Sequence, residues 1–324
     1  MMNKKIVENF PYQGVIIQNF FRFGGSYLYN SFIESNKTLG FYEPFHESLS
    51  NKKDYDFLKE NFEKFKINQR HPNKEFYFSN FPIDSDWFIK FHKENMPTMS
   101  FMLDRKDSKE CKIYLSNLIE YSLSKKLIPV FKINRMYLNP EILNFSKIYN
   151  IFIIRDPVTS FWSNVFLNRL EPYYYSINVH SKNKLNPFDK IVKIIESKKL
   201  EPIKMLKNKI NFQNKSQMDL HFSIFFLIWI YGFYKNLKHD FLFINYNQLF
   251  EKKYSNDISD KIFEKTNIKI NFNDFKINSF PIYNTIPNID EEMLAIIKET
   301  INYEELKMIL SEKNLTGISK YLPK

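Results

Sequence analysis

The chain contains a single cysteine, Cys111, among its 324 residues. One cysteine cannot form an intramolecular disulfide bond, and it cannot supply the several thiolates of a cysteine-based metal cluster. The six histidines are scattered, and neither a His-Glu-x-x-His motif nor a close pair of carboxylates occurs. We therefore expect no bound metal and a protein that tolerates a reducing compartment.

Long apolar runs are also missing. The longest, 222–233, is shorter than the roughly 20 residues that a transmembrane helix needs. The N-terminal residues lack the apolar core of about 7–15 residues that marks a secretory signal. We expect residues 222–233 to form a buried helix, and the chain to have no transmembrane segment and a cytoplasmic location.

Glycine is scarce: the chain has only 6, where average usage would predict about 23. Four of the 6 fall between Gly14 and Gly40, and two of these, Gly24 and Gly25, are adjacent. A chain that uses so little glycine places two together at one point, which makes residues 22–28 the first candidate for a functional turn.

Positive charge is in excess, with 47 Lys and Arg against 36 Asp and Glu and a net charge of +11. This surplus favours an anionic partner such as a nucleotide, a nucleic acid, a membrane or an acidic sugar. The alternative is a compositional origin, because the chain is also rich in Asn, Ile and Phe, as an AT-rich genome would produce. The charge is spread along the chain and no nucleic-acid-binding module is recognisable, so we expect no nucleic-acid partner.

Short apolar runs alternate with segments of helical periodicity. Strands are predicted over four apolar runs: 14–20, 128–133, 149–154 and 241–245. Helices are predicted at six places: after a cap at Ser26, over 111–127, from Pro157, over 221–237, and as two polar-faced helices from Pro287 onward. This alternation predicts an α/β fold with a mainly parallel central sheet flanked by helices.

The glycine turn between the first strand and its helix could hold a phosphate, because backbone N–H groups and the helix dipole at a helix N-terminus favour an anion. Arg22 adds a positive charge and Ser26 a hydroxyl. The turn matches neither the Walker A motif nor Gly-x-Gly-x-x-Gly, which counts against an ordinary ATPase or a dinucleotide dehydrogenase. A tight structural turn is the alternative.

A second strand end carries Arg155, and Ser163 follows on the next predicted helix. Ligands of open α/β sheets bind at the carboxyl edge of the strands, where a guanidinium can hold a phosphate through two hydrogen bonds. The alternative is a local ion pair between Arg155 and Asp156, with Pro157 simply starting a helix.

Together these segments resemble the signature series of sulfotransferases that use 3′-phosphoadenosine-5′-phosphosulfate (PAPS). The resemblance rests on three stretches taken in order: 22–28 (Arg-Phe-Gly-Gly-Ser-Tyr-Leu), 40–46 (Gly-Phe-Tyr-Glu-Pro-Phe-His) and 153–163 (Ile-Ile-Arg-Asp-Pro, then Ser163). It is nearest to carbohydrate sulfotransferases, whose first loop reads Arg-Ser-Gly-Ser-Ser-Phe-Leu and is followed by Tyr-Glu-Pro-Leu and a His. Residues 243–249 also resemble a late strand of that family.

The resemblance implies a P-loop-like, three-layer α/β fold in a single domain over 1–324, and a site for PAPS. In the family, the first loop holds the 5′-phosphosulfate, which corresponds here to Arg22, Phe23, Gly24, Gly25, Ser26 and Tyr27. The Arg and Ser of the second motif hold the 3′-phosphate, which corresponds to Arg155 and Ser163.

The resemblance also implies in-line transfer of a sulfuryl group to an acceptor hydroxyl or amine, which needs a base and a cation. Glu43 matches the family's Tyr-Glu-Pro glutamate and is the candidate base, and His46 could assist or orient it. Lys132 matches the strand lysine that approaches the sulfuryl group in relatives. The alternatives are an ion-paired surface carboxylate for Glu43 and a packed or solvated imidazole for His46.

The chain departs from the family at three of these positions. Gly25 stands where the family usually has Ser or Thr, so Ser26 would have to supply that hydroxyl. Asn164 stands where many carbohydrate-type relatives have Arg, and Asn134 where cytosolic small-molecule sulfotransferases carry a His. The last departure again favours Glu43 as the base.

The acceptor is expected to be a carbohydrate or a similar hydroxylated molecule. Residues 51–99 and 171–217 show no clear period and are predicted to be acceptor-specific insertions; Tyr173, Tyr174, Tyr175 and His180 could stack on sugar rings, and Arg135 could bind an acidic acceptor. The prediction is therefore a soluble, bacterial, PAPS-dependent carbohydrate sulfotransferase. The alternative is a non-catalytic protein that binds a nucleotide or a polyanion on the same fold.

Overall fold

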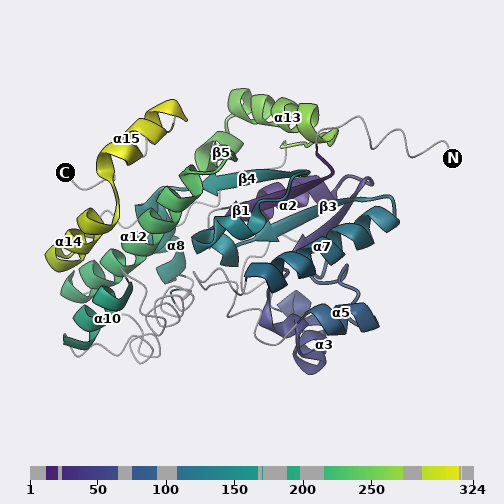
Figure 1. The fold of residues 1–324 in the computed structure, drawn as a ribbon, viewed down its shortest axis with the longest axis horizontal. Helices are drawn as coiled ribbons and strands as arrows, with labels where there is room; N and C mark the ends of the chain where they lie inside the picture. The colour runs from purple at the N-terminus through teal and green to yellow at the C-terminus, as the bar shows by residue number, and fades with distance from the viewer. Residues whose placement is uncertain are drawn as a thin grey trace. The chain divides into compact units, whose positions relative to one another are not determined.

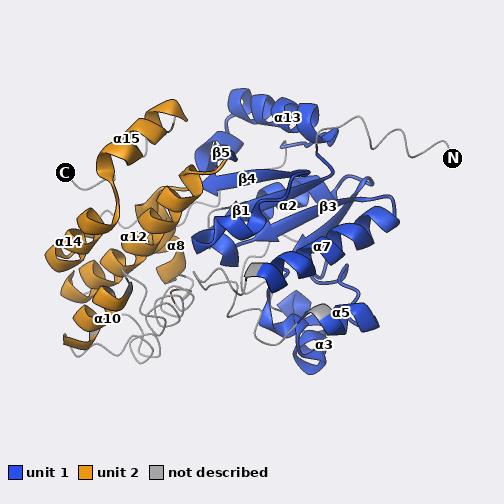
Figure 2. Cartoon of the chain, in the orientation of Figure 1, with its two compact units in different colours: residues 1–100, 104–154, 240–277 blue, residues 101–103, 155–239, 278–324 orange. Residues whose placement is uncertain are grey.

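The computed structural model describes residues 12–20, 24–64, 75–92, 108–166, 170, 188–197, 215–272, 287–313 and 315. They form an α/β structure built on one five-stranded, all-parallel sheet (Figure 1). The chain divides into two compact units: the first contains 1–100, 104–154 and 240–277, and the second 101–103, 155–239 and 278–324 (Figure 2). This division into compact units does not test the prediction of a single domain over 1–324, which stays a prediction.

The sheet belongs to the first unit and has the strand order β2-β3-β1-β4-β5. Its strands are β1 (Gly14–Asn19), β2 (Thr38–Tyr42), β3 (Ile128–Ile133), β4 (Ile148–Ile154) and β5 (Leu242–Asn245). Every residue of β1 is buried, as expected for a central strand of a parallel sheet that is covered on both faces. The chain goes from β1 to one side of the sheet and later returns to its other side at β4, so the strand order reverses at β1.

Helices cover both faces of this sheet within the first unit. On one face, α2 (Gly25–Ile33) and α13 (Lys252–Thr266) enclose a core that includes Val15, Ile17 and Leu28. On the other face, α3 (Lys52–Glu60), α5 (Asp86–Phe91) and α7 (Ser108–Ser124) enclose a core that includes Phe41, Phe131 and Tyr114. The predicted three-layer α/β arrangement is confirmed.

The second unit is helical in its described residues. It contains α8 (Pro157–Phe166), α10 (Phe188–Ser197), α12 (Lys215–Leu237), α14 (Glu291–Thr300) and α15 (Tyr303–Glu312). The centre of α12 is buried on all sides, which is why its sequence is almost uniformly apolar. Helices α14 and α15 bury one stripe each, including Met293, Ile297 and Leu306, so the prediction of two polar-faced helices is confirmed.

Short 3₁₀ segments complete the described structure: η1 (Glu47–Leu49), η2 (Arg135–Leu138), η3 (Pro140–Leu143) and η4 (Tyr246–Leu249). Among the described residues, no helix combines the length and the apolar character that crossing a membrane requires. The predicted insertions hold α3 and α5 in 51–99, and α10 and the start of α12 in 171–217. Residues 65–74 and 93–99 of the first insertion, and 171–187 and 198–214 of the second, lie outside the described part of the chain.

Two local features differ from the sequence-based expectation. Strand β2 was not predicted, because its five residues centre on Gly40 and show no alternation of polar and apolar side chains. The prediction that Ser26 caps the first helix is wrong: α2 begins at Gly25, and Gly24 is its N-cap. Gly24 takes that position because its left-handed backbone, with φ of 90°, strongly favours glycine.

Candidate functional site

The candidate site lies at the carboxyl ends of three neighbouring strands of the first unit. Strand β1 leads toward the glycine turn, β2 ends at Tyr42 immediately before Glu43, and β3 contains Lys132. In the paired register of the two parallel strands, Tyr42 lies opposite Lys132. Carboxyl ends of parallel strands at a reversal of strand order are where ligands of α/β sheets bind.

The first helix after the turn, α2, begins without a side-chain cap. A side chain at Gly24 would meet the ring of Tyr246, since an added Cβ would lie 2.2 Å from it. The N–H of Tyr27 donates to the Gly24 carbonyl over 3.0 Å. Among the described residues no side chain caps this N-terminus, so the positive end of the helix dipole could attract an anion.

Asn19 explains why glycine stands at position 25, where the family resemblance leads to Ser or Thr. A Cβ at Gly25 would lie 1.8 Å from Asn19 Oδ1, so the amide of Asn19 already fills the space of a side chain. Asn19 is 1% exposed, and its Nδ2 donates to the Phe20 carbonyl. The amide of Asn19, at the end of β1, therefore occupies the place where a Ser or Thr side chain at 25 would lie.

Ser26 is joined to strand β2 through a hydroxyl pair. Its Oγ lies 2.7 Å from the hydroxyl of Tyr42, with either oxygen able to donate. The ring of Tyr42 in turn lies beneath the ammonium of Lys132, 4.4 Å from Nζ to the ring centroid. A cation over an aromatic face is stabilised by the negative face of the ring, so Tyr42 links the glycine turn to the strand lysine.

Glu43 and Lys132 form a buried ion pair. Lys132 Nζ donates to Glu43 Oε1 over 2.7 Å, and their side chains are only 3% and 7% exposed, respectively. The backbone N–H of Asn134 donates to the same oxygen over 3.0 Å. Each charge is desolvated and depends on the other for compensation. The alternative of a surface carboxylate at 43 is thus excluded, and the two candidate catalytic groups lie in contact.

The other carboxylate oxygen of Glu43, Oε2, is buried and has no hydrogen-bond partner among the described residues. A buried carboxylate oxygen normally accepts at least one hydrogen bond. The arrangement leaves one oxygen held by Lys132 and Asn134 and the other open to a donor that is not part of the described structure.

The backbone at Glu43 is itself unusual, with φ of 47°. A non-glycine residue in this left-handed region costs on the order of 1–3 kcal/mol and persists only where the surroundings impose it. Here its N–H donates to the Lys132 carbonyl over 2.8 Å, and its carbonyl accepts from the His46 N–H over 2.9 Å. These bonds turn the chain so that the Glu43 side chain meets Lys132.

His46 lies next to this turn and has a structural role. Its Nδ1 accepts from the N–H of Ser48 over 3.2 Å and so caps η1. Its ring packs against Phe78, with 5.0 Å between centroids, and its Nε2 lies 3.8 Å from Glu47 Oε1. The alternative of a packed imidazole therefore fits these contacts, and assistance to Glu43 stays a prediction.

Glu47 is a charged residue that the sequence did not single out. It forms an ion pair with Arg135 as well as with His46. The Glu47 side chain is 60% exposed, and the partial desolvation that would raise its pKa is outweighed by electrostatic interaction with His46 and Arg135, which holds the pKa below its usual value. Arg135, the suggested contact for an acidic acceptor, is thus engaged by a carboxylate of the chain.

Arg155 and Ser163 belong to the second unit. Arg155 directly follows β4 in the chain, and its carbonyl accepts from Trp229 Nε1 over 3.2 Å. Asp156 Oδ1 accepts from the N–H of Thr159 over 2.6 Å at the start of α8, where Pro157 occupies the first helical position. The predicted helix start at Pro157 is confirmed.

Ser163 lies on α8 and is 1% exposed, with no hydrogen-bond partner for its hydroxyl among the described residues. Asn164, beside it, donates from Nδ2 to the Ser160 carbonyl over 2.8 Å, while its Oδ1 has no such partner. The role of Ser163 as a contact to the 3′-phosphate stays a prediction.

Several predicted residues lie outside the described part of the chain: Arg22, Phe23, Tyr173, Tyr174, Tyr175 and His180. In the ranges that the structure does describe, no group of three His, Cys, Asp or Glu side chains could hold a metal ion. Sequence reasoning missed Tyr42 and Asn19. Tyr42 could have been identified from its position, because it directly precedes Glu43 at the end of a strand.

No family model, curated protein or solved structure shows significant similarity to the chain.

Proposed function

We propose that the protein is a PAPS-dependent sulfotransferase that moves a sulfuryl group to a hydroxyl or amine of a carbohydrate-like acceptor. The observation that carries the proposal is the buried Glu43–Lys132 pair at the carboxyl ends of β2 and β3, in the same unit as the uncapped N-terminus of α2. A base, a cation and an anion-binding helix terminus are the groups that such a transfer needs.

The residues present suit the sulfuryl donor. The N-terminus of α2 and the hydroxyl of Ser26 would hold its 5′-phosphosulfate, and Arg155 with the unpartnered Ser163 would hold its 3′-phosphate. When bound, PAPS supplies a sulfuryl group that bonds to the acceptor oxygen as the bond from sulfur to the phosphate oxygen breaks, releasing adenosine 3′,5′-bisphosphate.

Glu43 would take the acceptor's hydroxyl proton, and its unpartnered Oε2 is the atom free to do so. Lys132 would place its positive charge against the negative charge that develops on the bridging oxygen. As the bridging oxygen gains charge, Lys132 would donate its hydrogen bond to that oxygen instead of to Glu43 Oε1. The Glu43 carboxylate would then be able to hold the proton taken from the acceptor. Tyr42 would keep the ammonium in line through its ring.

The nucleotide part of this proposal is tested by calorimetry at fixed salt, comparing adenosine 3′,5′-bisphosphate with AMP. Wild type should bind the bisphosphate more tightly by about 1.5–3 kcal/mol, because the 3′-phosphate gains charged hydrogen bonds. Arg155→Ala should lose most of that difference. Lys193→Ala, which removes an exposed charge from the same unit, is the matched control and should keep it.

The catalytic part is tested with radiolabelled PAPS and a mixture of hydroxylated glycosides. Glu43→Gln keeps the shape of the side chain and removes the base, so it should abolish transfer and retain nucleotide affinity. Because it also leaves Lys132 buried without its counter-charge, circular dichroism should first show that the variant is folded. Transfer at the wild-type rate by this variant would refute the role of Glu43. Equal, weak binding of both nucleotides would instead favour the alternative, a non-catalytic protein that binds a nucleotide or a polyanion.

A further inference from the structure

Four buried side-chain oxygens at the carboxyl edge of the sheet have no hydrogen-bond partner among the described residues. They are Gln18 Oε1 and Asn19 Oδ1 at the end of β1, Glu43 Oε2 directly after β2, and Asn134 Oδ1 directly after β3. The four residues are each 7% exposed or less. Buried polar atoms normally have a partner, so a ligand at this edge would have to bring hydrogen-bond donors.

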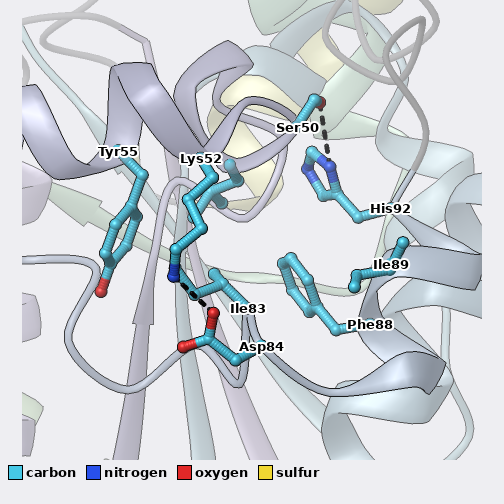
Figure 3. A pocket seen from close by; sticks show the side chains of 9 residues that line it. Ser50, Lys52, Tyr55, Ile83, Asp84, Phe88, Ile89 and His92 are labelled. Carbon is cyan, nitrogen blue, oxygen red and sulfur yellow. Dashed lines mark hydrogen bonds and ion pairs between the residues drawn. The ribbon is translucent and has the colours of Figure 1, made fainter.

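The cavity of about 450 Å³ that lies between α3 and α5 offers a contrast (Figure 3). The two charged side chains in its lining, Lys52 and Asp84, are exposed and pair with each other. Phe88 in its wall is 1% exposed and stacks on His92, with 5.3 Å between the ring centroids. The charged and aromatic groups of this cavity are thus engaged with one another, unlike the four oxygens at the sheet edge.

Several hydrogen-bond donors at the sheet edge are already engaged within the chain. Gln18 Nε2 donates to the Met136 carbonyl over 2.8 Å. The Asn134 N–H and Lys132 Nζ both donate to Glu43 Oε1. The edge therefore keeps acceptor atoms. A phosphosulfate carries oxygens without hydrogens at pH 7, so these acceptor atoms suit a hydroxylated ligand better than a sulfuryl donor.

Two of the four oxygens lie around the same carboxylate. The Asn134 N–H donates to Glu43 Oε1 over 3.0 Å, so the Asn134 side chain starts from the residue that holds this carboxylate. Covalent geometry keeps Asn134 Oδ1 within one side-chain length of it. Asn134 also follows Ile133, which pairs with Gln18 near the end of β1. A small ligand at Glu43 Oε2 can therefore also reach Asn134.

Charge restricts the ligand further. The side chains of Glu43 and Lys132 are 7% and 3% exposed, and their opposite charges cancel. An ammonium group beside Glu43 would lie close to the like charge of Lys132, which disfavours it. A neutral group with two adjacent donors avoids this repulsion and can serve both oxygens. Two hydroxyls on neighbouring carbons, as in a sugar ring, are such a group.

We propose that this edge binds a vicinal diol, with one hydroxyl donating to Glu43 Oε2 and its neighbour to Asn134 Oδ1. That the first of these hydroxyls receives the sulfuryl group rests on the proposed function. Asn134 then selects among acceptors, because a site that hydrogen-bonds a hydroxyl rejects the analogue that lacks it.

The test is saturation-transfer NMR titration of the full chain, without nucleotide, using small cyclic alcohols as probes. At least one of cis- and trans-cyclohexane-1,2-diol should bind about tenfold tighter, or more, than cyclohexanol, as one added hydrogen bond to a buried acceptor predicts. Cyclohexane-1,4-diol has the same two hydroxyls on distant carbons and should bind like cyclohexanol.

Asn134→Ala keeps the backbone N–H that holds Glu43 and should abolish the preference for the 1,2-diol. Asn150→Ala is the matched control and should retain it. Asn150 Oδ1 is also buried and without a partner among the described residues, but Asn150 lies within the sheet, paired with Ile16.

Failure of both 1,2-diols to bind overturns the proposal, as does equal affinity for the 1,4-diol or an equal effect of the two Ala variants. The comparison of ligands on the wild-type chain decides the matter even where a variant does not fold. The nucleotide titration is a separate measurement. A preference for the 1,2-diol without a preference for adenosine 3′,5′-bisphosphate would uphold the diol site and refute the sulfotransferase, and the reverse result would do the opposite.

Discussion

At the scale of single residues, the main feature is the buried ion pair of Glu43 and Lys132. Each is almost completely buried, and Lys132 is an unusual residue for an otherwise apolar strand. An isolated buried charge costs several kcal/mol, whereas a hydrogen-bonded pair offsets much of that cost. Among the described residues the pair leaves one carboxylate oxygen without a partner, as the role proposed for Glu43 requires.

Lys132→Met should lower the free energy of unfolding by about 3–5 kcal/mol, because it leaves the Glu43 carboxylate buried and uncompensated. Adding Glu43→Gln to this variant should recover much of the loss. Urea denaturation followed by circular dichroism measures both. Lys52→Met is the matched control: its pair with Asp84 is exposed, so the expected change is about 0–1 kcal/mol. Equal losses for the two lysines would contradict this assignment.

Tyr42 is expected to act through two separable contacts. Tyr42→Phe keeps the ring under Lys132 but removes the bond to Ser26, and should cost about 0.5–1.5 kcal/mol. Ser26→Ala should remove the same bond, so the double variant should cost little more than either single one. Additive losses, measured by urea denaturation, would show that the two hydroxyls do not stabilise each other.

At the scale of elements, the start of α2 depends on the end of β1. Asn19, the last residue of β1, occupies the space beside Gly25, and Tyr246 from η4 occupies the space beside Gly24. The helix therefore begins in a turn that has no room for side chains at either glycine. This crowding, together with the left-handed backbone at Gly24, accounts for two glycines at one point in a chain that has only 6.

Gly25→Ser, which introduces the residue type that the sulfotransferase resemblance leads one to expect, should destabilise the protein by about 1–3 kcal/mol through overpacking against Asn19. Replacing Asn19 by Ala in the same chain should relieve the clash and recover part of the stability. Thermal denaturation of the two variants and wild type tests this. A Gly25→Ser protein as stable as wild type would mean that Asn19 gives way easily.

At the scale of the whole molecule, each compact unit holds a buried histidine that is neutral at pH 7. Burial lowers the pKa of His92, in the first unit, to about 4, and burial likewise lowers that of His221, in the second, to about 4. The ordinary value is 6.5. The unfolded chain therefore binds more protons than the folded one between these values, and stability falls as the pH drops through that window.

Each histidine should contribute about 3 kcal/mol at neutral pH that is fully present above pH 6.5 and lost by about pH 4. Urea denaturation at several pH values should show a shallower acid loss in His92→Asn and in His221→Asn than in wild type. If both variants lose stability with pH as steeply as wild type, the acid sensitivity arises from other groups.

The sequence by itself determined most of the elements and the candidate residues, because these depend on patterns within a few residues of one another. Apolar runs and helical spacing identified β1, β3, β4 and β5 and the helices that alternate with them. The glycine pair was recognisable from composition and order, whereas Glu43 and Lys132 were singled out by the resemblance to sulfotransferases. Strand β2 was not, since a glycine at its centre removes the alternation on which a strand prediction depends.

Only the tertiary structure decided how these residues meet. Tyr42 lies opposite Lys132 because β2 and β3 pair in parallel, although 90 positions apart in the numbering, and local sequence carries no record of that register. The same holds for Asn19 beside Gly25, for Glu47 beside Arg135, and for the cavity between α3 and α5. Each of these contacts results from the packing of segments that are distant in the sequence. Side chains from several segments fill the available volume and pair their charges together, so no single segment predicts the contact.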